Sequence, residues 1–246
     1  MGHRPRRLRG EARPRRLLHV RRGLLRRRRG HLALRHPGPP GRHARLPFQE
    51  AARQYASQGA PAPKLAAVYG DDYRYTTDKA NAYEQVTFLG NHDMGRIGTF
   101  LKQDNPKADD AELLDRARLA NELMFLGRGN PVIYYGDEQG YTGAGGDKDA
   151  RQTLFASKTA DYLDDDQLGT DRTHASDAYD TKHPLYRSIA ALSKLTEEHP
   201  ALRDGVQTER YAKDSVYAFA YGRQAPVRIR RRHQQLRRVE DRRACH

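Results

Sequence analysis

Several residue types and sequence features are scarce or absent in this chain of 246 residues. Its single cysteine, Cys245, lies next to the C-terminus, so cysteine usage says nothing about the redox compartment. No apolar run has the length of a membrane span or of the apolar centre of a secretory signal. Neither a metal-ligand spacing nor a phosphate-binding glycine loop is visible. The sequence therefore predicts no membrane partner and no metal site, and it leaves location and oligomeric state unknown.

Lysine is missing from both ends of the chain, although arginine is abundant there. Residues 1–46 contain 16 Arg and one acid, and residues 223–246 contain nine Arg and two acids. Since the whole chain has a net charge of +14, residues 47–222 carry a charge of −8, and they contain all nine lysines. A basic chain would ordinarily indicate a nucleic-acid partner, but here the basic character belongs to the ends alone.

The Arg-rich ends allow two interpretations. Residues 1–46 use only nine residue types, dominated by Arg, Pro, Gly, His, Ala and Leu, as GC-rich DNA encodes in a wrong frame. The first interpretation is that 1–46 and 223–246 are frame-shifted or disordered segments around an in-frame middle. The second is a functional tail that binds nucleic-acid phosphates, although such tails often interleave Lys or aromatics, which both ends lack. The nucleotide sequence around the codons for Leu46 and Tyr221 distinguishes them, and we expect no specific nucleic-acid partner.

Hydrophobic periodicity divides the middle of the chain into alternating helices and strands. Helical spacing predicts helices over 48–57, 64–69 and 185–195, and a long helix capped by Asp109 or Asp110 and ended by Gly127 or Gly129. Apolar runs predict strands over 85–89 and 131–135, the second buried on both faces.

A polar loop over 136–183 and a hairpin complete the predicted order of elements. The alternating stretches 206–211 and 216–221 flank a Lys213-Asp214-Ser215 turn, as in a β-hairpin. Repeated strand–helix units favour a parallel α/β fold, and the closing hairpin indicates the start of a separate β domain.

Two short stretches end in polar side chains suited to carbohydrate chemistry. One is Phe88-Leu89-Gly90-Asn91-His92-Asp93, and the other is Gly129-Asn130-Pro131-Val132-Ile133-Tyr134-Tyr135-Gly136-Asp137-Glu138. Each begins with a predicted strand, and parallel barrels place their chemistry where strands end. Asp93 can accept from two adjacent sugar hydroxyls and supply negative charge to an oxocarbenium-like transition state. His92 can donate to a further hydroxyl, and Asn91 suits an orienting role. A bare Asn-His-Asp triplet, however, also occurs as a helix cap.

Both stretches match a known family over more than the triplet. The segment from Val86 to Arg96 resembles a signature segment of the α-amylase family, glycoside hydrolase family 13. The second stretch is similar to the family's last barrel strand, Gly-x-Pro-x-Ile-Tyr-Tyr-Gly-x-Glu. The resemblance covers roughly 47–221. It implies the C-terminal portion of a TIM (β/α)8 barrel over 47–205, from the end of strand 6 to helix 8, and the start of a C-terminal β domain over 206–222.

The resemblance also implies roles for individual residues. Asp93 takes the place of the transition-state stabiliser, and the substrate-binding residues are His92, Asn91, Arg151 and Tyr135. For Tyr134 and Tyr135, packing inside a barrel is an equal alternative. Arg151 has the alternative of a surface ion pair with Asp147 or Asp149, and Glu138 that of loop structure.

The implied activity is that of a retaining glycosidase acting on α-glucosidic bonds of starch-like glucans. No cofactor is expected in this chain. The resemblance implies calcium in the full-length family enzyme, with its usual ligands largely upstream, and an extracellular parent enzyme. The nucleophile and the acid/base also belong upstream, and residues 1–46 contain no Asp and one Glu. We therefore expect an unstable fragment, inactive alone. The alternatives are a non-catalytic glycan-binding module and, third, a basic nucleic-acid-binding protein.

Overall fold

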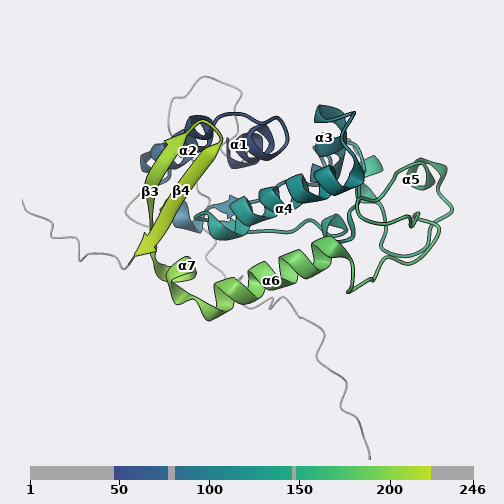
Figure 1. Cartoon of the computed structure of the whole chain (residues 1–246). Coiled ribbons are helices and arrows are strands. Elements are labelled where there is room, and N and C mark those ends of the chain that lie inside the picture. Colours follow the sequence, from purple (N-terminus) through teal and green to yellow (C-terminus); the bar gives the residue numbers. More distant parts are fainter. Residues whose placement is uncertain (1–46, 77–80, 146–147, 223–246) are drawn as a thin grey trace, which may run out of the picture. The chain divides into compact units, whose positions relative to one another are not determined.

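The computed structural model describes residues 47–76, 81–145 and 148–222 (Figure 1). They belong to the second of two contact units of the chain, which spans 42–246. The Arg-rich segments 1–46 and 223–246, and Asp147 with them, lie outside the described residues.

The order of elements follows the predicted alternation of helices and strands. The helices are α1 (Pro47–Ala56), α2 (Ala62–Gly70), α3 (Ile97–Asp104), α4 (Asp110–Leu126), α5 (Ala160–Leu163), α6 (Pro184–Glu198) and α7 (Pro200–Asp204). Short 3-10 helices are η1 (Asp71–Tyr75), η2 (Ala82–Glu84), η3 (Asp137–Gln139) and η4 (Asp149–Arg151). The strands are β1 (Val86–Thr87), β2 (Asn130–Pro131), β3 (Val206–Lys213) and β4 (Val216–Gly222).

The ends of the long helices confirm the signals read from the sequence. The Asp109 carboxylate accepts from the backbone N–H of Glu112 at 2.8 Å, which satisfies a free donor in the first turn of α4. Gly127 ends that helix, and its N–H donates to Leu123. Helix α6 runs from Pro184 to Glu198, so it contains the predicted span 185–195 and extends three residues beyond it.

A single apolar core joins the helices α1, α2, α3 and α4. The buried face of α4 lies in it, together with the inner faces of α1 and α3. Its buried members are Phe48, Ala51, Ala52, Ala56, Leu65, Leu89, Ile97, Leu101, Leu113, Ala117, Ala120, Leu123, Met124, Leu168 and Leu185. A bidentate ion pair between Arg53 and Asp104, with N···O distances of 2.8 and 2.9 Å, connects α1 to α3 at the edge of this core.

The two inner strands are parallel neighbours, as an α/β fold requires, but they are shorter than predicted. Val86 pairs with Asn130 and Thr87 with Pro131, so only two residues of each run form regular ladder. The prediction that 131–135 is buried on both faces is wrong, since Val132 is 47% and Tyr135 41% exposed. The reason is that β1 and β2 each have a strand on one edge only within the described residues.

Helix α3 was not predicted from the sequence. It is short, and Gly98 lies in its first turn, where glycine lowers helix propensity. A side chain at Gly98 would bring its Cβ within 2.6 Å of the Tyr141 carbonyl oxygen. Glycine is therefore required there by a distant loop, which local periodicity does not reveal.

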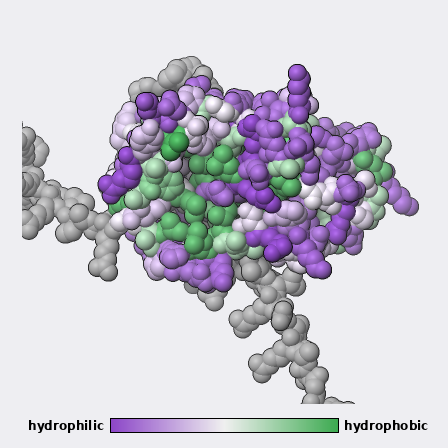
Figure 2. Space-filling view, viewed as in Figure 1, coloured by the Kyte–Doolittle hydropathy of each residue, from purple (hydrophilic) through white to green (hydrophobic). Residues whose placement is uncertain are grey.

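The predicted hairpin is present. Strands β3 and β4 pair antiparallel from Val206 opposite Gly222 to Lys213 opposite Val216. Asp214 makes the turn with a positive φ of 50°, which Asp tolerates better than most residues. On the face shown in Figure 2, apolar residues gather over the part that carries α4, α6 and the hairpin, whereas the part with α5 is mostly hydrophilic. No described helix has the length and apolar character needed to cross a bilayer.

Candidate functional site

A tight turn after β1 presents the Asn-His-Asp triplet. The backbones of Asn91 and Gly95 exchange two hydrogen bonds, at 3.1 and 3.2 Å. The side-chain oxygen of Asn91 accepts from the N–H groups of Asp93 and Met94, at 2.8 and 3.0 Å. Asn91 therefore uses its side-chain oxygen to shape the turn that carries His92 and Asp93.

Asp93 lies at the exposed tip of this turn with two cationic or hydrogen-bonding neighbours. Its side chain is 69% exposed, and its Oδ1 lies 3.2 Å from Nε2 of His92. The same oxygen lies 3.7 Å from a guanidinium nitrogen of Arg151, which comes from η4 in a distant loop. The structure thus brings together three of the five predicted site residues, and each of them is open to solvent.

The sequence also allowed an ion pair of Arg151 with Asp147 or Asp149. Asp147 lies outside the described residues. Arg151 contacts Asp93, and this contact is compatible with other contacts of Arg151. A 3.7 Å separation is an ion pair without a short hydrogen bond. It leaves both side chains accessible to a ligand.

Arg96, three residues after Asp93, is fully buried and anchors the turn. Its Nε donates to the side chain of Gln152 at 2.7 Å. One terminal nitrogen donates to the Tyr135 carbonyl at 2.7 Å and to Asp137 at 2.9 Å. The guanidinium also lies 4.4 Å from the ring centroid of Tyr134. Arg96 therefore ties the turn after β1 to the chain that follows β2.

Burial shifts the acids around Arg96 toward their neutral forms. It raises the pKa of Asp137 to about 7, although the Arg96 guanidinium acts in the opposite direction. Burial likewise raises the pKa of Glu138, whose carboxylate accepts from the Gly136 N–H at 2.8 Å. This contact agrees with the interpretation of Glu138 as loop structure.

The loop after β2 packs directly on the turn. The Gly143 carbonyl accepts from the Arg96 N–H at 3.2 Å and from the Thr99 hydroxyl at 2.7 Å. Gly95 has a φ of +99°, and a Cβ there would lie 2.8 Å from the Gly145 nitrogen. These close backbone contacts hold the segment that leads to Arg151 against the segment that carries Asp93.

The two predicted tyrosines have different surroundings. The Tyr134 hydroxyl donates to the Ala150 carbonyl at 2.8 Å, and its ring packs on Arg96, as expected of a packing residue. Tyr135 is 41% exposed and meets the Tyr134 ring edge to face, with centroids 4.8 Å apart. Tyr135 is thus available to a ligand while its backbone carbonyl binds Arg96.

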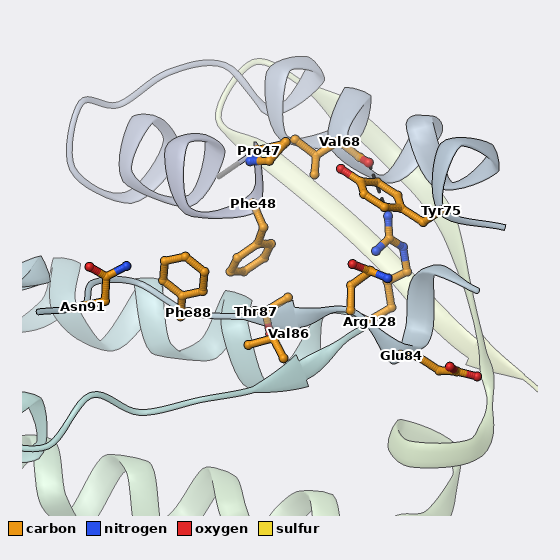
Figure 3. Close-up of a pocket in the computed structure, with 11 residues that line it drawn as sticks. Pro47, Phe48, Val68, Tyr75, Glu84, Val86, Thr87, Phe88, Asn91 and Arg128 are labelled. Atoms are coloured by element: carbon orange, nitrogen blue, oxygen red, sulfur yellow. Dashed lines mark hydrogen bonds between the residues drawn. The ribbon is translucent and has the colours of Figure 1, made fainter. Parts of the chain in front are cut away.

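A separate cavity of about 530 Å³ opens beside β1 (Figure 3). Phe48 from α1 faces Phe88 and Thr87 across it, with Asn91 at one end and Arg128 at the other. Neither His92, Asp93 nor Arg151 lines it. The candidate site is therefore the exposed turn, and the cavity marks the side of β1 that has no strand within the described residues. No cluster of His, Cys, Asp and Glu able to hold a metal ion occurs within the described part of the chain.

Sequence reasoning assigned no role to Arg96, and no local signal was available. Arg96 lies just before α3, where a cation faces the positive end of the helix dipole and is unfavourable unless it is paired. This position became visible only with α3, which was not predicted from the sequence. The buried acid that pairs with Arg96 is Asp137.

Comparison with known sequences gives a family for this chain. The family model for the α-amylase catalytic domain matches residues 40–205. An α-amylase of Streptomyces lividans is 78% identical over 178 residues, which is 72% of this chain and 19% of the relative. A β/α-amylase of Paenibacillus polymyxa is 29% identical over 63% of this chain and 10% of the relative. The chain thus spans about a fifth or less of these relatives.

Solved structures share the fold. An Anoxybacillus α-amylase superposes with a TM-score of 0.52 at 23% identity, over 71% of this chain and 32% of that one. The α-amylase of Geobacillus thermoleovorans, solved with acarbose, gives 0.53 at 23% identity, over 72% and 33%. The parallel strands, the turn that carries Asp93 and the family match together show that the chain belongs to the α-amylase family and represents part of its catalytic barrel.

Proposed function

We propose that this chain supplies the Asp93 part of an active site that cleaves α-glucosidic bonds in starch-like glucans with retention. The observation that carries the proposal is Asp93 at the exposed end of a parallel strand, with His92 and Arg151 at its carboxylate. The high identity to an α-amylase supports the same conclusion.

The chemistry of each group follows from its position. An exposed carboxylate such as Asp93 accepts from two neighbouring sugar hydroxyls and stabilises positive charge that develops on the ring. His92 and Arg151 offer donors to further hydroxyls on either side of it. Arg96 holds the turn so that these groups keep their geometry during the reaction.

Cleavage with retention needs two further carboxyl groups about 5–5.5 Å apart. The family resemblance implies that these two groups come from barrel segments before residue 47, and residues 1–46 contain no Asp and one Glu. We therefore expect the purified chain to release no reducing sugar from starch. Release above a boiled control, lost in Asp93→Asn, would contradict this expectation.

A hybrid enzyme tests the proposed role directly. Residues 47–222 replace the matching segment of the Streptomyces lividans α-amylase, which supplies the rest of a barrel. We expect the hybrid to hydrolyse starch and Asp93→Asn to lower kcat by about 100-fold or more, as for loss of transition-state stabilisation. The matched control is Asp115→Asn, an exposed acid of α4 that pairs with Arg118.

The same hybrid separates the proposal from its rival, a non-catalytic glycan-binding module. That alternative is favoured by the scarcity of acids in residues 1–46, which contain no Asp and one Glu. A folded hybrid that binds maltoheptaose but does not hydrolyse starch would establish it. Equal activity of the hybrid and its Asp93→Asn variant would overturn the role of Asp93.

A further inference from the structure

Two aromatic side chains lie exposed and in contact on the loop region 136–183. Phe155 is 64% and Tyr179 is 53% exposed, and their ring centroids are 5.6 Å apart. The rings meet at 67°, edge to face. Neither ring belongs to the apolar core. Two large aromatics gathered on a surface indicate a binding site more strongly than a single exposed ring.

The chain holds this aromatic pair, Phe155 and Tyr179, on two segments that are clamped together. The Ser157 N–H donates to the His174 carbonyl at 2.8 Å, and the Ala178 N–H donates to the Leu154 carbonyl at 2.8 Å. The carboxylate of Asp177 accepts from the Ala156 N–H, also at 2.8 Å. These three hydrogen bonds hold the two segments that carry the rings. The surface is therefore preformed, which reduces the conformational entropy lost when a ligand binds.

Polar groups suited to hydroxyls lie next to the pair along the chain. Asp180 follows Tyr179 and forms an ion pair with Arg172 at 3.3 Å, with both side chains partly exposed. The backbone of Asp180 is fixed by both ends of the Gln139 amide. An aromatic surface beside a carboxylate and a guanidinium presents both an apolar and a polar face.

The pair is also linked to the candidate active site through one short segment. Phe155 lies four residues after Arg151, whose guanidinium is near Asp93. The carbonyl of Thr153, between them, accepts from the buried Tyr141 at 2.9 Å. Phe155 is therefore close to Arg151 along the chain, on the segment that follows the candidate site.

We propose that Phe155 and Tyr179 form a second contact for the same α-glucan chain, outside the cleavage position. This inference rests on the proposed function. Aromatic rings bind the apolar C–H faces of pyranose rings, and the Arg172 and Asp180 side chains bind the hydroxyls at the edges. An α-1,4-glucan is curved, so successive sugars meet two rings set at an angle, whereas a flat β-1,4-glucan suits coplanar rings.

Affinity electrophoresis of the full chain tests the proposal with amylopectin in the gel. Phe155→Ala and Tyr179→Ala are each expected to weaken the apparent affinity by about 3- to 10-fold, the usual value of one aromatic contact. Phe155→Tyr is expected to retain binding. The matched control is Tyr73→Ala, which removes an equally exposed aromatic from η1 and is expected to change nothing. Circular dichroism verifies that each variant is folded.

Each result bears on the proposal. If the variants are retarded as strongly as the native chain, the proposed binding role of Phe155 and Tyr179 is wrong. It is also wrong if amylopectin does not retard the native chain. Equal retardation by hydroxyethylcellulose would overturn the preference for an α-glucan. Hydrolysis of maltotriose by the hybrid enzyme reports the Asp93 site alone, so failure of the pair and failure of the proposed function are distinguishable.

Discussion

Two buried arginines, Arg96 and Arg128, stand in similar surroundings but support different parts of the molecule. Arg96 lies beside the tyrosines at 134, 135 and 141 and pairs with the buried Asp137. Arg128 lies 5.0 Å from the centroid of Tyr69 and pairs with Asp72. Each guanidinium donates to backbone carbonyls from distant segments.

The difference lies in what each arginine joins. Arg96 joins the turn of Asp93 to the loop that carries Arg151. Arg128 joins α2 to the chain entering β2, and its own N–H donates to Gln207 of the hairpin at 2.8 Å. Burial lowers the pKa of Arg128, opposed by the neighbouring tyrosines. One cluster therefore supports the candidate site, and the other supports the junction between barrel and hairpin.

Breaking the two clusters in turn should give the largest effects. We expect Arg96→Met to lower the free energy of unfolding by about 3–5 kcal/mol, because it leaves the buried Asp137 without its cation. Arg128→Met should cost less, because its partner Asp72 is 33% exposed. Urea unfolding of the hybrid enzyme measures this. In the hybrid enzyme, below its unfolding temperature, only Arg96→Met is expected to lower kcat.

An exposed pair provides the control for this comparison. Arg118→Met removes an i, i+3 partner of Asp115 on the surface of α4, and should cost less than about 1 kcal/mol. A loss of kcat in Arg128→Met as large as in Arg96→Met would show that both clusters serve the site, contrary to the division described above.

A smaller loss of stability is expected from a methyl group added next to Tyr141, one of the three tyrosines around Arg96. Gly136 has a φ of +91°, and a Cβ there would lie 2.4 Å from the ring of Tyr141. Gly59 has a similar φ of +64°, with nothing within 4 Å of an added Cβ. Gly59→Ala should therefore cost about 1–2 kcal/mol from the backbone alone. Gly136→Ala should lower the free energy of unfolding clearly more than Gly59→Ala does. Equal losses for the two variants in thermal unfolding would show that the Tyr141 ring moves aside for the added methyl group.

The smallest expected effect is a dependence of stability on pH from His174, which packs edge to face on Tyr141. Burial, and then Arg96, lowers the pKa of His174 from 6.5. The unfolded chain therefore takes up this proton first as pH falls, so the stabilisation is present above pH 6.5 and is lost on acidification. The carboxyls with raised pKa act in the opposite direction, so the comparison must be between variants.

His174→Phe isolates this contribution, because the carboxyls are common to both chains. We expect the stability of the native chain relative to His174→Phe to fall as the pH is lowered from 7.5 to 5. Urea unfolding at each pH measures the difference. A difference that stays constant over this range would mean that the folded and unfolded states titrate His174 alike.

Features encoded by neighbouring residues were predicted well. The Asp109 cap, the Gly127 stop and the Asp214 turn depend on backbone conformations set within a few residues. The Asp93 segment was found because its chemistry lies in consecutive side chains.

Features that depend on distant segments were missed or predicted wrongly. Helix α3 has a glycine that a remote carbonyl requires, and the strand over 131–135 is short and exposed because burial depends on strands beside it. The burial of Arg96 depends on Asp137, 41 residues away. The aromatic pair arises only when residues 155 and 179 meet.

The sequence by itself determined the family, the helix ends, the hairpin and the identity of the exposed triplet, because caps, turns and consecutive motifs are local. Only the tertiary structure decided that Arg151 lies near Asp93 and that the Asn91 side chain hydrogen-bonds within the turn. It also decided that the two buried arginines stabilise different parts of the fold. The physical reason is that ion pairing and burial depend on the space around a side chain, which segments far apart in the sequence supply together.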